Sequence, residues 1–198
     1  MIMWNIIRAA GIGAYLMLWA SVTWGLVATT SPFGKRVPKA TSVALHQAFS
    51  TLGLLLLITH LGVLLVDSFM PFGWLDLLIP MRATYRPAGV AFGIGAMVLM
   101  ALVLLTSWFR KQVKPTWWRR FHALSVPAFS LALVHGLMTG TDSPRPTMFW
   151  FYLATTAILL FLVLLRAMTV GMRAARRAPT RSAVPLRPVG DLADRRTA

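Results

Sequence analysis

The chain has 198 residues, of which 57% are hydrophobic and 13% charged, and its mean hydropathy is +0.67. A soluble domain carries about twice that charged fraction, and too little polar surface is present to cover a water-soluble globule. The composition therefore excludes an ordinary soluble protein. The lack of cysteine excludes disulfides, thiolate metal sites, iron–sulfur clusters and covalently attached c-type haem.

The net charge of +15 is compatible with nucleic-acid binding, but the distribution of the basic residues is not. They fall between apolar segments or after Gly171, and they alternate in density from one connection to the next. This is the positive-inside pattern of membrane proteins. No soluble element carries a basic face interleaved with aromatic residues. We therefore expect a lipid bilayer, and no nucleic acid, as a partner.

Five apolar segments predict an all-α, polytopic membrane helical bundle with about five transmembrane helices, because about 20 residues cross about 30 Å of hydrocarbon. The first segment is expected to be retained, since it lacks a convincing small-residue cleavage site for a signal peptide. The segments are Ala9–Ala28, Val43–Val66, Ala88–Phe109, Phe121–Leu137 and Met148–Ala167.

Orientation follows from the charges of the connections. The second and fourth connections contain aspartates beside their arginines, whereas the first and third are purely basic. The basic residues concerned are Lys35, Arg36, Lys39, Arg110, Lys111, Lys114, Arg119 and Arg120. The positive-inside rule then places the first and third connections and the Arg-rich C-terminus in the cytoplasm, and the N-terminus outside. We expect an integral protein of a bacterial plasma membrane.

Residues outside the spans receive simpler interpretations. The segment Met70–Pro87 is too short to span and is expected to lie at the outer interface or to cap the bundle. Four tryptophans fit an interfacial belt, with an electron path as the alternative: Trp74, Trp117, Trp118 and Trp150. Residues 1–172 form the predicted membrane domain. Residues 173–198 form a predicted disordered Arg/Pro-rich cytoplasmic tail near anionic headgroups.

All four histidines fall in two of the spans, His46 and His60 in the second and His122 and His135 in the fourth. Ionisable side chains at bilayer depth are costly and mark candidate functional sites. One such histidine is equally well explained as a neutral residue hydrogen-bonded to a neighbouring helix. Two pairs, each confined to one helix, are harder to explain in that way.

The spacing of the histidines predicts how they pair. His46 and His60 are fourteen residues apart, about 21 Å of rise and about 3.9 turns, so they share nearly one face. His122 and His135 are thirteen apart, which differs by about 100° around an ideal helix, and Pro127 between them can restore the face by bending it. The second and fourth spans run in the same direction. His46 is therefore expected to face His122, and His60 to face His135.

Two facing imidazoles can hold an iron porphyrin axially, as a six-coordinate b-type haem suited to electron transfer. We therefore predict two stacked haems about 20 Å apart, with the four histidines as axial ligands and no catalytic acid, base or nucleophile. A bare metal ion fits less well, because no Asp, Glu or Cys completes either pair.

Further residues are consistent with this hypothesis but less specific. Some glycines can admit a flat macrocycle or simply pack helices: Gly53, Gly62, Gly89, Gly93, Gly95, Gly136 and Gly140. Some cations can bind haem propionates or anchor the topology. They are Lys39, Arg119 and Arg120 for the inner haem, and Arg8, Arg82, Arg86 and Arg145 for the outer one.

The motif His46-x13-His60 on one span and His122-x12-His135 two spans later resembles the ferric reductase-like transmembrane domain. That superfamily includes NADPH oxidases, ferric reductases and bacterial haem-binding subunits of methionine sulfoxide reductase systems. The unequal spacing is similar to that of NADPH oxidases, and Arg8 followed by Gly11 is similar to the span before the first histidine helix. The resemblance covers about residues 5–170.

The resemblance implies two b-type haems that pass electrons between the two membrane faces. Family members commonly receive electrons from a flavin, but neither a flavin-binding domain nor a Gly-rich dinucleotide fingerprint follows the last span here. A separate cytoplasmic donor, a flavin reductase or a quinol, is therefore implied, and binding of flavin to this chain stays open.

Other functions also stay open at this level. The outer haem could reduce ferric iron, oxygen or another acceptor directly, although bis-histidine ligation leaves no open iron position. The chain could instead be a haem-free scaffold or transporter with structural histidines. Metal transport and proton relay are less favoured, because no intramembrane carboxylate accompanies the histidines.

Overall fold

The computed structural model describes residues 2–30, 37–69 and 72–177, and this part of the chain is helical without strands. The elements are α1 (Ile2–Thr30), α2 (Lys39–Val66), the 3₁₀ helix η1 (Trp74–Leu77), α3 (Pro87–Trp108), α4 (Pro115–Ala123), α5 (Ser125–Thr139) and α6 (Pro146–Arg177). Five spans of this part are long and apolar enough to cross a membrane, with α4 and α5 together making the fourth. The predicted fold class is confirmed.

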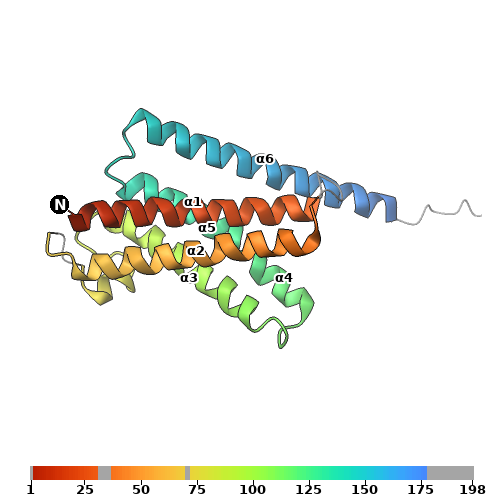
Figure 1. Cartoon of the computed structure of the whole chain (residues 1–198), viewed down its shortest axis with the longest axis horizontal. Coiled ribbons are helices and arrows are strands. Elements are labelled where there is room, and N and C mark those ends of the chain that lie inside the picture. The colour runs from red at the N-terminus through yellow and green to blue at the C-terminus, as the bar shows by residue number, and fades with distance from the viewer. Residues whose placement is uncertain (1, 31–36, 70–71, 178–198) are drawn as a thin grey trace, which may run out of the picture.

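The long helices lie roughly along one axis and alternate in direction (Figure 1). We call the two ends of the bundle the α4 end, where α2 begins and α3 finishes, and the η1 end, where α1 begins and α5 leads into α6. In Figure 1 both α2 and the α4–α5 span run from the α4 end toward the η1 end, so the two histidine-bearing spans are parallel.

The fourth span is not one helix. The sequence predicts a single helix over Phe121–Leu137 that bends at Pro127, whereas the structure starts at Pro115 and breaks at Leu124. The break lies three residues before the proline because Pro127 has no N–H to donate to the carbonyl of residue 123. His122 is thus on α4 and His135 on α5.

Helix boundaries follow local chemistry. Proline occupies the first position of α3, α4 and α6, where its missing N–H costs nothing and its fixed φ suits a helix. The predicted outer segment Met70–Pro87 contains η1 and a turn in which Met81 has a φ of 67°. Met70 and Pro71, and the Lys35 and Arg36 of the first connection, lie outside the described residues. So does the predicted tail from residue 178 on, while α6 continues to Arg177.

The core lies between α1, α5 and α6. Phe129 is 1% exposed and packs with its ring centre 5.1 Å from that of Tyr15. The Tyr15 hydroxyl is 2.7 Å from Thr155 Oγ1, so the buried phenol has a partner. Elsewhere α1 packs along α2, and α3 packs along α5, which gives two helix hairpins.

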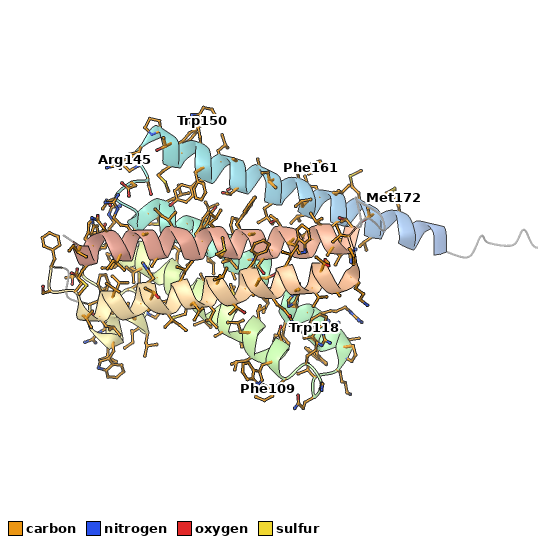
Figure 2. The ribbon with its side chains drawn as sticks, viewed as in Figure 1. Phe109, Trp118, Arg145, Trp150, Phe161 and Met172 are labelled. Carbon is orange, nitrogen blue, oxygen red and sulfur yellow. The ribbon has the colours of Figure 1, made fainter. Side chains whose placement is uncertain are left out.

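The outer surface of the bundle is apolar. Figure 2 shows Trp150, Phe161 and Met172 on the side of α6 that faces away from the other helices, and Phe161 is 65% exposed. Many leucines, isoleucines and valines of α2 and α3 are similarly exposed. Such a surface is unfavourable in water and suits contact with lipid. The chain has the architecture of an integral membrane protein.

Candidate functional site

The structure brings the four histidines together in two facing pairs. The ring centres of His46 and His122 are 5.9 Å apart, and those of His60 and His135 are 6.5 Å apart. A metal–imidazole bond is about 2 Å long and the ring nitrogen lies about 1 Å from the ring centre, so two imidazoles that share one metal have centres about 6 Å apart. The two rings of each pair are therefore separated by the distance expected of two imidazoles that bind one metal.

Three of the four rings are anchored through Nδ1. His46, His60 and His135 place Nδ1 at 3.0, 2.9 and 2.8 Å from the backbone carbonyls of residues 21, 7 and 89 respectively. A carbonyl only accepts a hydrogen bond, so each Nδ1 carries the proton and each Nε2 of the neutral ring keeps its lone pair. No described residue gives any of the four Nε2 atoms a hydrogen-bond partner. Metal-binding histidines in proteins are commonly oriented in this way, with the ring N–H that does not face the metal donating to a carbonyl.

The anchored rings lie against glycines. A Cβ atom at Gly93 would be 2.6 Å from Nδ1 of His135, one at Gly11 would be 3.1 Å from Nδ1 of His60, and one at Gly25 would be 3.6 Å from the ring of His46. Each glycine follows the accepting carbonyl by four residues. At Gly93 and Gly11 the lack of a side chain lets the ring approach the carbonyl over one turn of helix, whereas a Cβ at Gly25 would make ordinary contact with the ring.

The fourth ring is held differently. Nδ1 of His122 is 3.4 Å from the hydroxyl of Ser107, with which it makes a longer bond than the others. Trp118, one turn earlier on α4, stacks on the His122 ring with ring centres 5.0 Å apart and planes 24° apart. Trp118 thus contacts a histidine of the site, whereas Trp117 is half exposed, and the interfacial position of both tryptophans stays a prediction.

A single cavity of about 1270 Å³ connects the two pairs, and all four histidines line it. This volume exceeds the 300–1000 Å³ that is typical of a pocket for one small ligand (about one drug-sized molecule). Apart from the histidines and the two ends, its lining is mostly aliphatic, with residues such as Leu57, Ile94 and Val126. The cavity runs from the α4 end to the η1 end.

Helix α2 forms one wall of this cavity. It packs mainly against α1, and none of its 28 residues, all of them described, is buried. A helix that carries two histidines toward its neighbours and yet buries no side chain has its inner face open to the cavity.

The two ends of the cavity differ in charge. Its α4 end is lined by the cations Lys39, Arg110, Arg119 and Arg166. Asp142 is the one acidic side chain in the described lining, and it lies at the η1 end, where it pairs with Arg8 and, at 3.1 Å, with Arg145. A carboxylate would be bound readily at the α4 end, where cations line the cavity, and less readily at the η1 end, where Asp142 lies.

The predicted cations thus have different surroundings. Arg119 and Lys39 line the cavity, whereas the guanidinium of Arg120 lies 5.2 Å from the ring centre of Trp117. Arg8 lines the cavity but is paired with Asp142. The remaining outer arginines bind protein groups: Arg82 pairs with Asp76, Arg86 donates to the carbonyl of Met138, and Arg145 pairs with Asp142.

Sequence reasoning did not single out Gly25, Ser107, Arg110 or Arg166 as site residues. A signal for two of them was present, since Gly11 and Gly25 on α1, and Gly93 and Ser107 on α3, are each fourteen residues apart, like His46 and His60. Gly62, by contrast, was a candidate packing position, but a Cβ there would meet nothing within 4 Å.

The site does not have the ligands for a bare metal ion. No group of three or more His, Cys, Asp or Glu side chains that could hold one occurs among the described residues. Each facing pair offers two nitrogen donors, whereas structural metal sites built from protein alone use four or more ligands. Any metal held here needs its other ligands from a non-protein group.

Comparison with family models places the chain in one family. The family model described as a domain of unknown function, DUF8596, matches residues 2–142, and the chain belongs to this family. The matched region contains α1 to α5 with all four histidines and ends before α6. No curated protein and no solved structure matches the chain.

Proposed function

We propose that this DUF8596 protein is a membrane electron-transfer subunit whose two histidine pairs hold two b-type haems. One observation carries the proposal: opposed imidazoles at 5.9 and 6.5 Å, with three of the four turned by a carbonyl so that Nε2 points away from its support. Nothing in ordinary helix packing requires this arrangement twice along one cavity.

The residues fit haem better than other metal groups. An iron porphyrin supplies four equatorial nitrogens and needs two axial ligands, which is what each pair offers. It is flat and largely apolar, like the aliphatic lining of the cavity, and its two propionates need cations. Lys39, Arg110 and Arg119 would hold those of the group at the α4 end.

When bound, the haem iron supplies one-electron oxidation and reduction. The protein's own contribution is positional. Histidine nitrogens fix the depth of each group, the carbonyls of Ile7, Ser21 and Gly89 hold the rings in one tautomer, and the aliphatic walls exclude water. Low polarity around a redox centre limits reorganisation and side reactions.

The basic α4 end is proposed to face the cytoplasm of a bacterium, with the chain in its plasma membrane. Its connection from Arg110 to Lys114 and the cations of the cavity mouth would then meet a separate electron donor, a flavin reductase or a quinol. Because the chain lacks cysteine, Lys111→Cys and Arg82→Cys can each be labelled selectively in intact cells. A membrane-impermeant maleimide should react with the Arg82→Cys protein alone, and the reverse result would invert the orientation.

The direct test of haem binding is a pyridine haemochrome assay on the full chain, purified from membranes of haem-replete cells, with a spectrum after dithionite reduction. We expect two haems per chain, in line with two axial pairs, and a sharp α band of six-coordinate low-spin iron. A matched His46→Ala/His60→Ala protein should lose the band. A folded wild-type protein without haem would overturn the proposal in favour of a helical scaffold or transporter.

A further inference from the structure

Four positions on α1 and α3 support the four histidine rings, and one of them is different in kind. Gly93 and Gly11 leave the space in which a ring reaches a carbonyl one turn away, and Gly25 has the same position beside His46, where a Cβ would make ordinary contact. The equivalent position beside His122 is Ser107, which is fourteen residues after Gly93, just as Gly25 is fourteen after Gly11. In both helix hairpins a glycine therefore lies beside each histidine ring, except at His122, where the residue is Ser107.

The exception changes the hydrogen-bond partner of Nδ1. By the same four-residue rule, the carbonyl that corresponds to those of Ile7, Ser21 and Gly89 is that of Val103, but the hydrogen bond found for the His122 ring in the described part of the chain goes to the side chain of Ser107. Among the described residues, Nδ1 of His122 has the Ser107 hydroxyl alone as its partner, at 3.4 Å instead of 2.8–3.0 Å. The hydroxyl of Thr106 also lies 3.2 Å from the Val103 carbonyl and competes for it.

The backbone around His122 is also less restrained. His122 lies on a helix of nine residues and two positions before the break at Leu124. His46, His60 and His135 lie on helices of 28 and 15 residues that pack along a neighbour. A short helix next to a break gives a ligand more freedom to withdraw.

Building on the proposed haem sites, we propose that His122 is an exchangeable ligand, and that a small neutral molecule such as carbon monoxide binds at the α4 end in its place. A strong hydrogen bond from Nδ1 to a carbonyl raises the basicity of Nε2 and strengthens its bond to the metal. His122 lacks that bond. In the exchange the iron–Nε2 bond breaks and the incoming molecule donates its own electron pair, while the proton stays on Nδ1 and no electron is transferred.

The test is carbon monoxide binding to the full, haem-loaded and dithionite-reduced protein, followed by the difference spectrum. About half of the haem should bind carbon monoxide, since the His60–His135 pair is anchored by two carbonyls. In Ser107→Gly we expect the ring to reach the Val103 carbonyl and the carbon monoxide affinity to fall about tenfold, the smaller of the effects seen when the hydrogen-bond partner of a metal-binding histidine is changed. Gly62→Ser is the control, because a Cβ there would meet no described atom within 4 Å; its carbon monoxide affinity should not change.

A second variant tests the proposal even if the Ser107→Gly protein does not fold. His60→Ala/His135→Ala keeps the α4-end pair, and all of its remaining haem should bind carbon monoxide with wild-type affinity. A two-haem protein that binds no carbon monoxide, binds it equally at both haems, or keeps its affinity in Ser107→Gly overturns the assignment of His122. A protein without haem overturns the proposed function instead, so the two failures are distinguishable.

Discussion

At the η1 end, His60 and His135 both donate from Nδ1 to backbone carbonyls, at 2.9 and 2.8 Å, and both rings lie closely over glycines. At the α4 end, His46 is held in the same way, but His122 has a hydroxyl at 3.4 Å and a tryptophan stacked on its ring. The two pairs thus offer the same ligands with unequal support. Both rings of the η1-end pair have short hydrogen bonds to carbonyls, whereas one ring of the α4-end pair, His122, has only a longer bond to a hydroxyl.

The charges around the two pairs differ in the same sense. At the η1 end Arg8 of the cavity lining is paired with Asp142, whereas the cavity lining at the α4 end has cations without an acid among the described residues. The α4 end of the cavity therefore attracts anionic groups more strongly than the η1 end does. We infer that the α4 end is where the protein exchanges material or electrons with a partner, and the predictions below test this difference.

The largest effect is expected from removing a ligand of the strongly held pair. His135→Ala should lower the haem content by about half, because the remaining imidazole cannot hold the group at the η1 end alone. The pyridine haemochrome assay measures it. Leu55→Ala, at a 54% exposed position of α2, is the control and should retain all haem. Full haem content in His135→Ala would refute the pairing.

Filling the space behind a ring should have the next largest effect. A methyl group at Gly93 would lie 2.6 Å from Nδ1 of His135, and the Gly89 carbonyl bond would be lost. Gly93→Ala should therefore release most of the haem from the η1 end, Gly11→Ala less and Gly25→Ala almost none. Gly62→Ala is the matched control, since nothing lies within 4 Å. The order of haem retention in detergent checks this, and equal retention in all four would contradict the role of the glycines.

A moderate loss of stability should follow from opening the ion pair at the η1 end. Asp142 is 11% exposed and ties Arg8 of α1 to the connection before α6. Asp142→Asn should lower stability by about 1–2 kcal/mol, less than for a fully buried pair because Arg8 is 30% exposed. Thermal unfolding in detergent measures the change. The Arg8→Gln/Asp142→Asn protein completes a double-mutant cycle, and additive losses would show that the two residues do not interact.

The smallest effect concerns the stacking on His122. Trp118→Leu removes a ring whose stacking contributes about 0.5–1.5 kcal/mol and whose Nε1 is buried without a hydrogen-bond partner among the described residues. We expect a shift in one of two components of a spectral redox titration, the one assigned to the α4 end by His46→Ala. A shift of the other component would show that the two sites are not independent. Trp150→Leu, on the outer side of α6 (Figure 2), should shift neither.

Much of this was accessible from the sequence. Apolar runs of about 20 residues predict spanning helices because a bilayer leaves few alternatives for the backbone. The positions of His46, His60, His122 and His135 at two depths follow from helical rise alone. The direction of the spans then determines which histidines are at the same depth.

The support of the rings could not be predicted. Whether Nδ1 finds a carbonyl depends on how closely two helices approach and how they are rotated, and neither is encoded in the spacing on one helix. The same holds for Trp118, which the sequence places at an interface and the fold places on His122. Pro127 predicted a bend but not its position at Leu124, nor that α4 would be separate.

The sequence by itself determined a helical membrane protein with histidines at two levels, because hydrophobicity and helix geometry act along the chain. Only the tertiary structure decided that three rings are hydrogen-bonded to carbonyls and one to a hydroxyl, because those bonds form between helices that meet after folding. The difference between the two pairs thus lies in the contacts between packed helices, at Ser107 beside His122.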